Sequence, residues 1–277
     1  MCLIVLAWHA HPDYPLIIAG NRDEFYTRRT RPAAWWGQAV SLLAGQDEEA
    51  GGTWFGITRR GRLAALTNVR APSERNPHAP SRGALVVAAL QTPERVDRWL
   101  ERHAHRTAAF NGFNMLAGDV MAIDGNQPGS LHYYSNRHDA PPRTIEPGVY
   151  GLSNAFLDTP WPKVNRAVAR FACTIASRVR IDDLLDLMAD RTLARDPELP
   201  QTGVPLDWER ALSAVQIRAN GYGTRATTAL TVRADGLATF YERTFDTADP
   251  QRWDDRHFEF MIDTEARPAR LKTRDPN

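Results

Sequence analysis

Runs of apolar residues separated by turn residues dominate the first quarter of the chain. Residues 3–8 and 16–21 are rich in Ile, Val and Leu, and the segment between them contains Pro12 and Pro15, which cannot continue a strand. Residues 53–58 and 62–67 flank the turn sequence Arg-Arg-Gly. The pattern therefore predicts two β-hairpins, separated by a polar stretch that contains Pro32, Trp35 and Trp36.

Apolar residues at three-to-four spacing predict helices further along the chain. Residues 161–177 and 181–193 each carry such a stripe, and Cys173, beside the first stripe, is predicted to be a small packed side chain. A third helix begins at Pro93, which suits a first helical turn, and a fourth is expected at about residues 82–90.

Short strands are predicted between and after these helices. Their ranges are residues 113–117, 120–123, 131–134, 149–152, 214–217, 227–232 and 237–241. Runs of neighbouring strands favour antiparallel sheets with segregated helices over a doubly wound parallel sheet. We therefore expect an α+β fold, a four-layer αββα sandwich of two mainly antiparallel sheets. Residues 1–262 would form one domain, followed by a charged, flexible tail over residues 263–277.

Composition and charge narrow the function classes. The 277 residues are 43% hydrophobic and 24% charged, which fits an ordinary globular fold. The net charge of +1 and the lack of a long basic block argue against a nucleic-acid partner. No stretch approaches the roughly 20 apolar residues of a membrane span, and the apolar start is unlike a signal peptide. With two cysteines and no disulfide framework, a reducing, cytoplasmic location is expected.

The strongest candidate for chemistry is Cys2. Removal of the initiator Met would leave a thiol and a free α-amine on one residue. That amine has an ordinary pKa of about 7.7–8.0, so a neutral fraction can serve as the base for the thiol. A cysteine at this position is also compatible with an ordinary buried strand residue.

Three further groups stand at predicted strand ends. Arg22, Asp23 and Glu24 follow the strand expected to pair with the one that starts at Cys2, so the arginine can favour a thiolate and a carboxylate can hold the amine. The other polar residues at strand ends are Asn68, Asn154 and Arg225. An asparagine amide there either completes a turn or stabilises an oxyanion, and the arginine either caps the sheet or binds a carboxylate.

No metal site is indicated. His9 and His11 would share one face of a strand, and His103 and His105 on a helix would not face each other. Surface histidines explain both pairs, and the eight histidines form no cluster with ligand spacing.

Several motifs together resemble one known family, the NRDE family, also called the transport and Golgi organisation protein 2 family. They span about residues 1–245 in the family's order. These motifs are Met1-Cys2, Asn21-Arg22-Asp23-Glu24-Phe25, Gly51-Gly52-Thr53-Trp54, the run at residues 63–68, Asn111-Gly112-Phe113-Asn114, the run at residues 150–155, Thr159-Pro160-Trp161 and Gly221-Tyr222-Gly223-Thr224-Arg225.

The resemblance implies the fold of N-terminal-nucleophile (Ntn) hydrolases, with a more distant likeness to bile-salt hydrolases, penicillin V acylases and acid ceramidase. Carried over by motif, the catalytic roles fall to Cys2, Arg22, Asp23, Asn68, Asn154 and Arg225. Ligand contacts fall to Glu24, Trp54 and Tyr222. In those hydrolases the aspartate follows the arginine by several residues, whereas here two carboxylates follow it directly, so either one can serve the amine.

Two functions are compatible with this resemblance. The first is Cys2-dependent hydrolysis of a small or lipid-like non-peptide amide, with no cofactor required. The second is non-catalytic binding and trafficking of haem or of an acyl-lipid or acyl-coenzyme A ligand, because a fold can keep its pocket after losing its chemistry. The sequence contains no haem attachment motif and indicates no oligomeric state.

Overall fold

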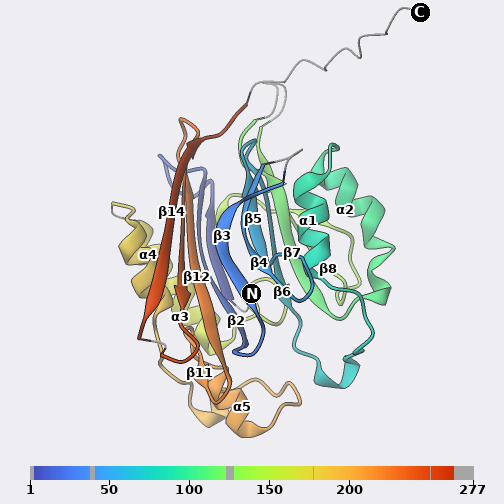
Figure 1. Ribbon diagram of the computed structural model, residues 1–277, viewed down its shortest axis with the longest axis vertical. Helices are drawn as coiled ribbons and strands as arrows, with labels where there is room; N and C mark the ends of the chain where they lie inside the picture. Colours follow the sequence, from blue (N-terminus) through green and yellow to red (C-terminus); the bar gives the residue numbers. More distant parts are fainter. Residues whose placement is uncertain (1–2, 38–40, 123–127, 177, 250, 265–277) are drawn as a thin grey trace, which may run out of the picture.

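The computed structural model describes residues 3–37, 41–122, 128–176, 178–249 and 251–264. Within these ranges the chain forms two seven-stranded antiparallel sheets that face each other, with helices on their outer sides (Figure 1). No helix in the described part of the chain is long and apolar enough to cross a membrane.

The first sheet has the two N-terminal strands near its centre. Its strands, in spatial order, are β10 (Gly148–Leu152), β1 (Leu3–Trp8), β2 (Leu16–Phe25), β12 (Tyr222–Val232), β13 (Leu237–Phe245) and β14 (Trp253–Met261), with β11 (Arg218–Ala219) paired to β12. Strands β1 and β2 form the predicted hairpin, in which Leu3 pairs with Asn21 and Trp8 with Leu16.

The second sheet follows the chain in simple order. Its strands are β3 (Thr30–Trp36), β4 (Leu42–Asp47), β5 (Phe55–Thr58), β6 (Arg62–Asn68), β7 (Phe113–Asp119), β8 (Ser130–Ser135) and β9 (Arg143–Thr144). Strands β5 and β6 form the second predicted hairpin, and Gly61 in its turn has a φ of 76°, a conformation that glycine adopts without strain.

Burial on both faces explains the continuous apolar run of β1. Alternate side chains of a strand point to opposite faces, so Ile4 and Leu6 pack between the two sheets with Phe55. Leu3 and Val5 pack on the other face, against the helices α3 (Pro162–Ile175) and α4 (Ile181–Met188). Helices α1 (Gly83–Gln91) and α2 (Val96–Ala104) cover the second sheet in the same way. The predicted αββα sandwich is confirmed.

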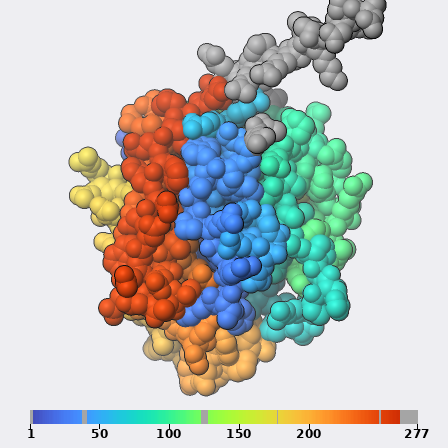
Figure 2. All heavy atoms as spheres, in the orientation of Figure 1, coloured from blue at the N-terminus to red at the C-terminus, as the bar shows by residue number. Residues whose placement is uncertain are grey.

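Several elements were not predicted, namely the strands β3, β4, β9, β11 and β14 and the helix α5 (Leu206–Ala211). Strand β3 contains Pro32 at a register shift on the edge of its sheet, where a missing N–H is tolerated. Strand β14 is another edge strand, and its mostly exposed, charged side chains conceal the apolar pattern. Helix α5 has six residues, too few for a helical period to show. Figure 2 shows β14, in red, beside the blue segment that contains β3 and β4, and Trp35 and Phe260 lie 5.0 Å apart there.

Other predicted boundaries need correction. Residues 214–217 are buried but form no strand, because the carbonyl of Val215 accepts a hydrogen bond from a side chain. Strand β7 ends at Asp119, so residues 120–122 are not a strand, and residue 123 lies outside the described ranges. Helix α4 ends at Met188, not at residue 193. Cys173 is exposed on α3 and not packed. Of the predicted tail, residues 265–277 lie outside the described ranges, and the N–H of Asp263 bonds to the carbonyl of Arg59 at 2.8 Å.

Candidate functional site

A cleft of about 370 Å³ opens at the end of β2 where that strand carries Asp23 and Glu24. It lies between the end of β6, the loop after it, the turn after β10 and helix α5. Five of the nine predicted site residues line it, namely Asp23, Glu24, Asn68, Asn154 and Tyr222. Cys2 lies outside the described residues, and Leu3, the first that is described, pairs with Asn21 on β2.

Asn21, the first residue of the Asn-Arg-Asp-Glu run, is completely buried on the helix side of the sheet. Its side-chain amide donates to the carbonyls of Met188 and Val215, at 2.9 and 2.8 Å, and its oxygen accepts from the Thr227 hydroxyl at 2.7 Å. These bonds attach the end of α4 and residues 213–217 to strands β2 and β12. The role of Asn21 is structural.

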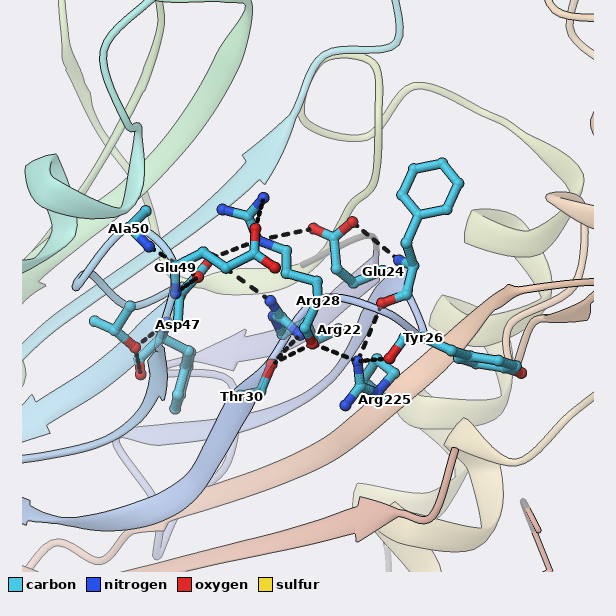
Figure 3. A network of polar contacts seen from close by, with 12 residues as sticks. Arg22, Glu24, Tyr26, Arg28, Thr30, Asp47, Glu49, Ala50 and Arg225 are labelled. Carbon is cyan, nitrogen blue, oxygen red and sulfur yellow. Dashed lines mark hydrogen bonds and ion pairs between the residues drawn. The ribbon is translucent and has the colours of Figure 1, made fainter. Parts of the chain in front are cut away.

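Arg22 points the other way, into the space between the sheets. One of its terminal nitrogens donates to the Thr30 hydroxyl at 3.0 Å, and the other lies 3.8 Å from the Asp47 carboxylate (Figure 3). Its guanidinium carbon lies 4.3 Å from the centre of the Trp54 ring, which is a cation–π contact. Arg22 and Trp54 are 3% and 5% exposed, and neither lines the cleft.

The two carboxylates that follow Arg22 differ in environment. Asp23 is buried and accepts a hydrogen bond of 2.6 Å from the Thr224 hydroxyl on β12. Glu24 is half-buried and lies 4.0 Å from Arg28, which also bonds to Asp47 at 2.8 Å (Figure 3). Glu24 is therefore neutralised in part by a guanidinium, whereas Asp23 is fixed by a neutral donor on the neighbouring strand.

The two asparagines meet on one side of the cleft. The Asn154 amide donates to the backbone carbonyl of Asn68 at 2.9 Å, and the Asn154 carbonyl accepts from the Arg70 N–H at 2.7 Å. One donor of Asn154 is thus committed to holding β6 against the turn after β10. The side-chain amide of Asn68 makes no hydrogen bond to any residue that the structure describes, so of the two amides it is the one left available to a ligand.

Arg225 occupies a β-bulge and does not line the cleft. The register of β12 against β2 shifts between Thr224 and Ala226, which leaves Arg225 as the extra residue. Its guanidinium donates to the carbonyls of Phe25, Tyr26 and Arg28, at 3.1, 3.4 and 2.8 Å (Figure 3). Burial, followed by the nearby charge of Arg22, lowers the pKa of Arg225. The Arg225 side chain closes the turn between β2 and β3. Of the two roles considered for this arginine, capping the sheet and binding a carboxylate, these contacts correspond to capping.

Comparison with known proteins agrees with this architecture. The model of the family described as Transport and Golgi organisation 2 matches residues 1–247. The chain belongs to this family.

Full-length relatives support the assignment. The Transport and Golgi organization protein 2 homolog of Homo sapiens is 37% identical over 95% of this chain and 99% of its own length. The Bos taurus homolog has the same identity and coverage. Among solved structures, the C2A mutant of conjugated bile acid hydrolase from Clostridium perfringens has a TM-score of 0.50 and 8% identity, covering 98% of this chain and 100% of that one. This likeness shows an Ntn-hydrolase-like fold.

A buried carboxyl group that sequence reasoning missed lies behind Arg22 in this Transport and Golgi organisation 2 family member. Glu242 on β13 is 1% exposed and accepts a hydrogen bond of 2.6 Å from the backbone N–H of Ala33. Desolvation raises its pKa from 4.5 to about 7, opposed by that hydrogen bond and by the charge of Arg22. Gly45 leaves space for the Trp54 ring beside these residues, because a Cβ at position 45 would lie 2.5 Å from that ring.

Other residues of the cleft were also missed. Among them are Phe25, Arg28, Arg70, Arg75, Arg82, Trp208 and Leu212. Asp47, which does not line the cleft, bonds to Arg28 from β4. Phe25 is part of the family motif, but its 50% exposure is visible only in the fold. Trp208 lies on α5, which has no sequence signal. Within the described ranges, no group of three or more His, Cys, Asp or Glu side chains is placed to hold a metal ion.

Proposed function

We propose that this protein is a cysteine amidohydrolase that uses Cys2 to cleave a small or lipid-like non-peptide amide. The observation that supports the proposal best is the convergence of Asp23, Asn68 and Asn154 on one cleft at the end of the strand that pairs with β1. The chain reaches Cys2 one peptide bond before Leu3, and Leu3 pairs with Asn21, two residues from Asp23.

The proposed reaction needs removal of Met1. The free α-amine of Cys2 takes the thiol proton, and the sulfur attacks the amide carbonyl. The side-chain amide of Asn68 donates to the oxyanion that forms, and the amine proton passes to the leaving nitrogen as the C–N bond breaks. Water then hydrolyses the thioester and releases the acid, which restores the thiol. Asp23 holds the Cys2 amine in this scheme, because Glu24 is already close to Arg28.

Two substitutions test the reaction. Cys2→Ala is expected to abolish amine release from an acyl-amide panel, while Cys173→Ala, the matched control at an exposed helical position, keeps full activity. Asn68→Ala is expected to lower kcat by about 10²–10³-fold, as the loss of one oxyanion donor does elsewhere. Intact mass measurement of the untagged protein establishes whether Met1 has been removed. Unchanged turnover by Cys2→Ala would refute the proposal.

Non-catalytic carriage is the second candidate, and the aromatic side of the cleft favours it for an apolar ligand. Phe25, Trp208 and Tyr222 line the cleft together. Haem fits less well than an acyl group, because no His, Cys or Met stands among the described lining residues and only Tyr222 offers a familiar axial ligand. A haem titration that gives a Soret shift abolished by Tyr222→Phe would favour haem, and the absence of any shift at micromolar haem counts against it.

A further inference from the structure

One side of the cleft is an aromatic wall, formed by Phe25, Trp208 and Tyr222. The ring centres of Phe25 and Tyr222 are 5.1 Å apart, and those of Trp208 and Tyr222 are 5.6 Å apart, both with edge-on geometry. Edge-to-face contacts of this kind fix aromatic rings in place. Phe25 nevertheless remains 50% exposed. A rigid, exposed aromatic surface that lines a cleft is typical of a binding site for an apolar group.

The opposite side is a basic wall, formed by the loop after β6 and the start of α1, with Arg75 and Arg82. Arg75 is exposed, and its side chain makes no hydrogen bond or ion pair with any residue in the described ranges. The acidic residue beside it, Glu74, is engaged elsewhere, by Arg137 at 2.7 Å. Arg82 donates to the Gly112 carbonyl at 3.0 Å, which holds its guanidinium along this wall.

The remaining arginines of the cleft are already neutralised. Arg28 lies 2.8 Å from Asp47 and 4.0 Å from Glu24, and Arg70 lies 2.8 Å from the buried carboxylate of Glu209. On the basic wall, Arg75 therefore keeps a positive charge that no residue in the described ranges neutralises. Because Arg75 is exposed, its attraction for an anion is screened by salt.

Three polar residues, Asp23, Asn68 and Asn154, line the same cleft. We propose that the ligand is an anionic amphiphile of the N-acyl amino acid class, which lies across the cleft with its acyl group on the aromatic wall and its carboxylate on the basic wall. This orientation brings the amide to the asparagines. The inference rests on the proposed function for its reactive amide, and the volume of about 370 Å³ suits a small molecule of this kind.

Binding to the inert Cys2→Ala protein tests the ligand class separately from catalysis. The probes are N-octanoylalanine and its neutral N-methylamide, measured by titration calorimetry at low and at physiological salt. We expect the carboxylate to bind about three- to fivefold more tightly than the neutral probe at low salt, which corresponds to one partly screened ion pair. We expect this preference to shrink as salt rises.

Four variants in the same background assign the two walls. Arg75→Gln is expected to remove the preference for the carboxylate, whereas Arg98→Gln, which removes an exposed arginine on α2 that does not line the cleft, retains it. Phe25→Ser is expected to weaken both probes about tenfold through lost apolar contact. Leu193→Ser, at a residue that is 55% exposed and outside the cleft lining, leaves both affinities unchanged.

The outcomes separate this inference from the proposed function. Equal affinity for the two probes, or a preference that survives Arg75→Gln, overturns the inference even when wild-type protein hydrolyses amides. The expected binding pattern without any turnover by wild-type protein supports the ligand class and contradicts the hydrolase.

Discussion

The buried carboxyl group of Glu242 makes a quantitative prediction about stability. Its pKa of about 7 in the folded protein stands above the ordinary value of 4.5, because burial between the sheets disfavours the charged form. A carboxyl group whose pKa is raised on folding supports the folded state fully below pH 4.5, and its contribution is lost as the pH rises through about 7. The difference between these two pKa values is equivalent to about 3 kcal/mol.

Glu242→Gln removes this titration while keeping the shape of the side chain. Its amide oxygen can still accept the hydrogen bond of the Ala33 N–H, and its amide group carries no charge at any pH in this range. Relative to wild type, the variant is therefore expected to gain about 3 kcal/mol of unfolding free energy between pH 4.5 and pH 8. The attraction between ionised Glu242 and Arg22 lowers the pKa of Glu242, and the value of about 7 already includes this effect.

Urea unfolding at several pH values between 4.5 and 8 measures the difference, with Glu101→Gln as the control. Glu101 is exposed on α2, so its substitution changes the net charge equally without removing a buried group. The two variants share every other titrating group with wild type, and comparison with the control therefore isolates Glu242. A Glu242→Gln difference that is constant over this pH range, or equal to that of the control, would refute the reasoning.

Two further predictions concern side chains that hold the cleft together. Arg225→Met is expected to lower the unfolding free energy by about 2–3 kcal/mol, because it leaves the carbonyls of Phe25, Tyr26 and Arg28 without their donor. Urea unfolding measures this loss. An unchanged unfolding free energy together with weakened ligand binding would instead assign Arg225 to ligand binding. In a double-mutant cycle, Arg70→Met is expected to cost about 3 kcal/mol by leaving the buried Glu209 carboxylate uncompensated, and adding Glu209→Gln should recover part of that loss. Strict additivity of the two substitutions would show that the ion pair contributes no coupling.

The prediction of the fold succeeded where the apolar pattern of the sequence is strong and failed where that pattern is weak. The buried strands β1 and β2 and the striped helix α3 follow from the sequence, because both require regular burial of apolar side chains. The edge strands β3 and β14 do not, since an edge strand buries few side chains and carries charges that discourage pairing with other chains. Residues 214–217 misled the prediction because they are buried without a continuous strand partner: the carbonyl of Val215 accepts from the Asn21 side chain, and only Ile217 bonds to Thr224 on β12.

The sequence predicted which residues belong to the candidate site better than it predicted how those residues are arranged. The sequence motifs identified Asp23, Asn68 and Asn154, and the structure brings all three to one cleft. The basic wall and α5 could not be found in this way, because a cleft between distant segments has no sequence period. Arg22 and Arg225 were predicted to act on the thiol or on a ligand because they stand at strand ends, and in the structure both are held by contacts within the protein.

The arrangement of residues 21–24 follows from strand alternation. Consecutive side chains on β2 face opposite sides of the sheet, so Asn21 reaches the helix layer while Arg22 reaches Trp54 between the sheets. At the strand end, Asp23 and Glu24 leave the covered part of the sheet and line the cleft. Four adjacent polar residues thus secure α4, fill the space between the sheets and supply two carboxylates. Substitution of Asn21 or Arg22 should therefore act first on stability, and only substitution of Asp23 or Glu24 should act directly on a ligand.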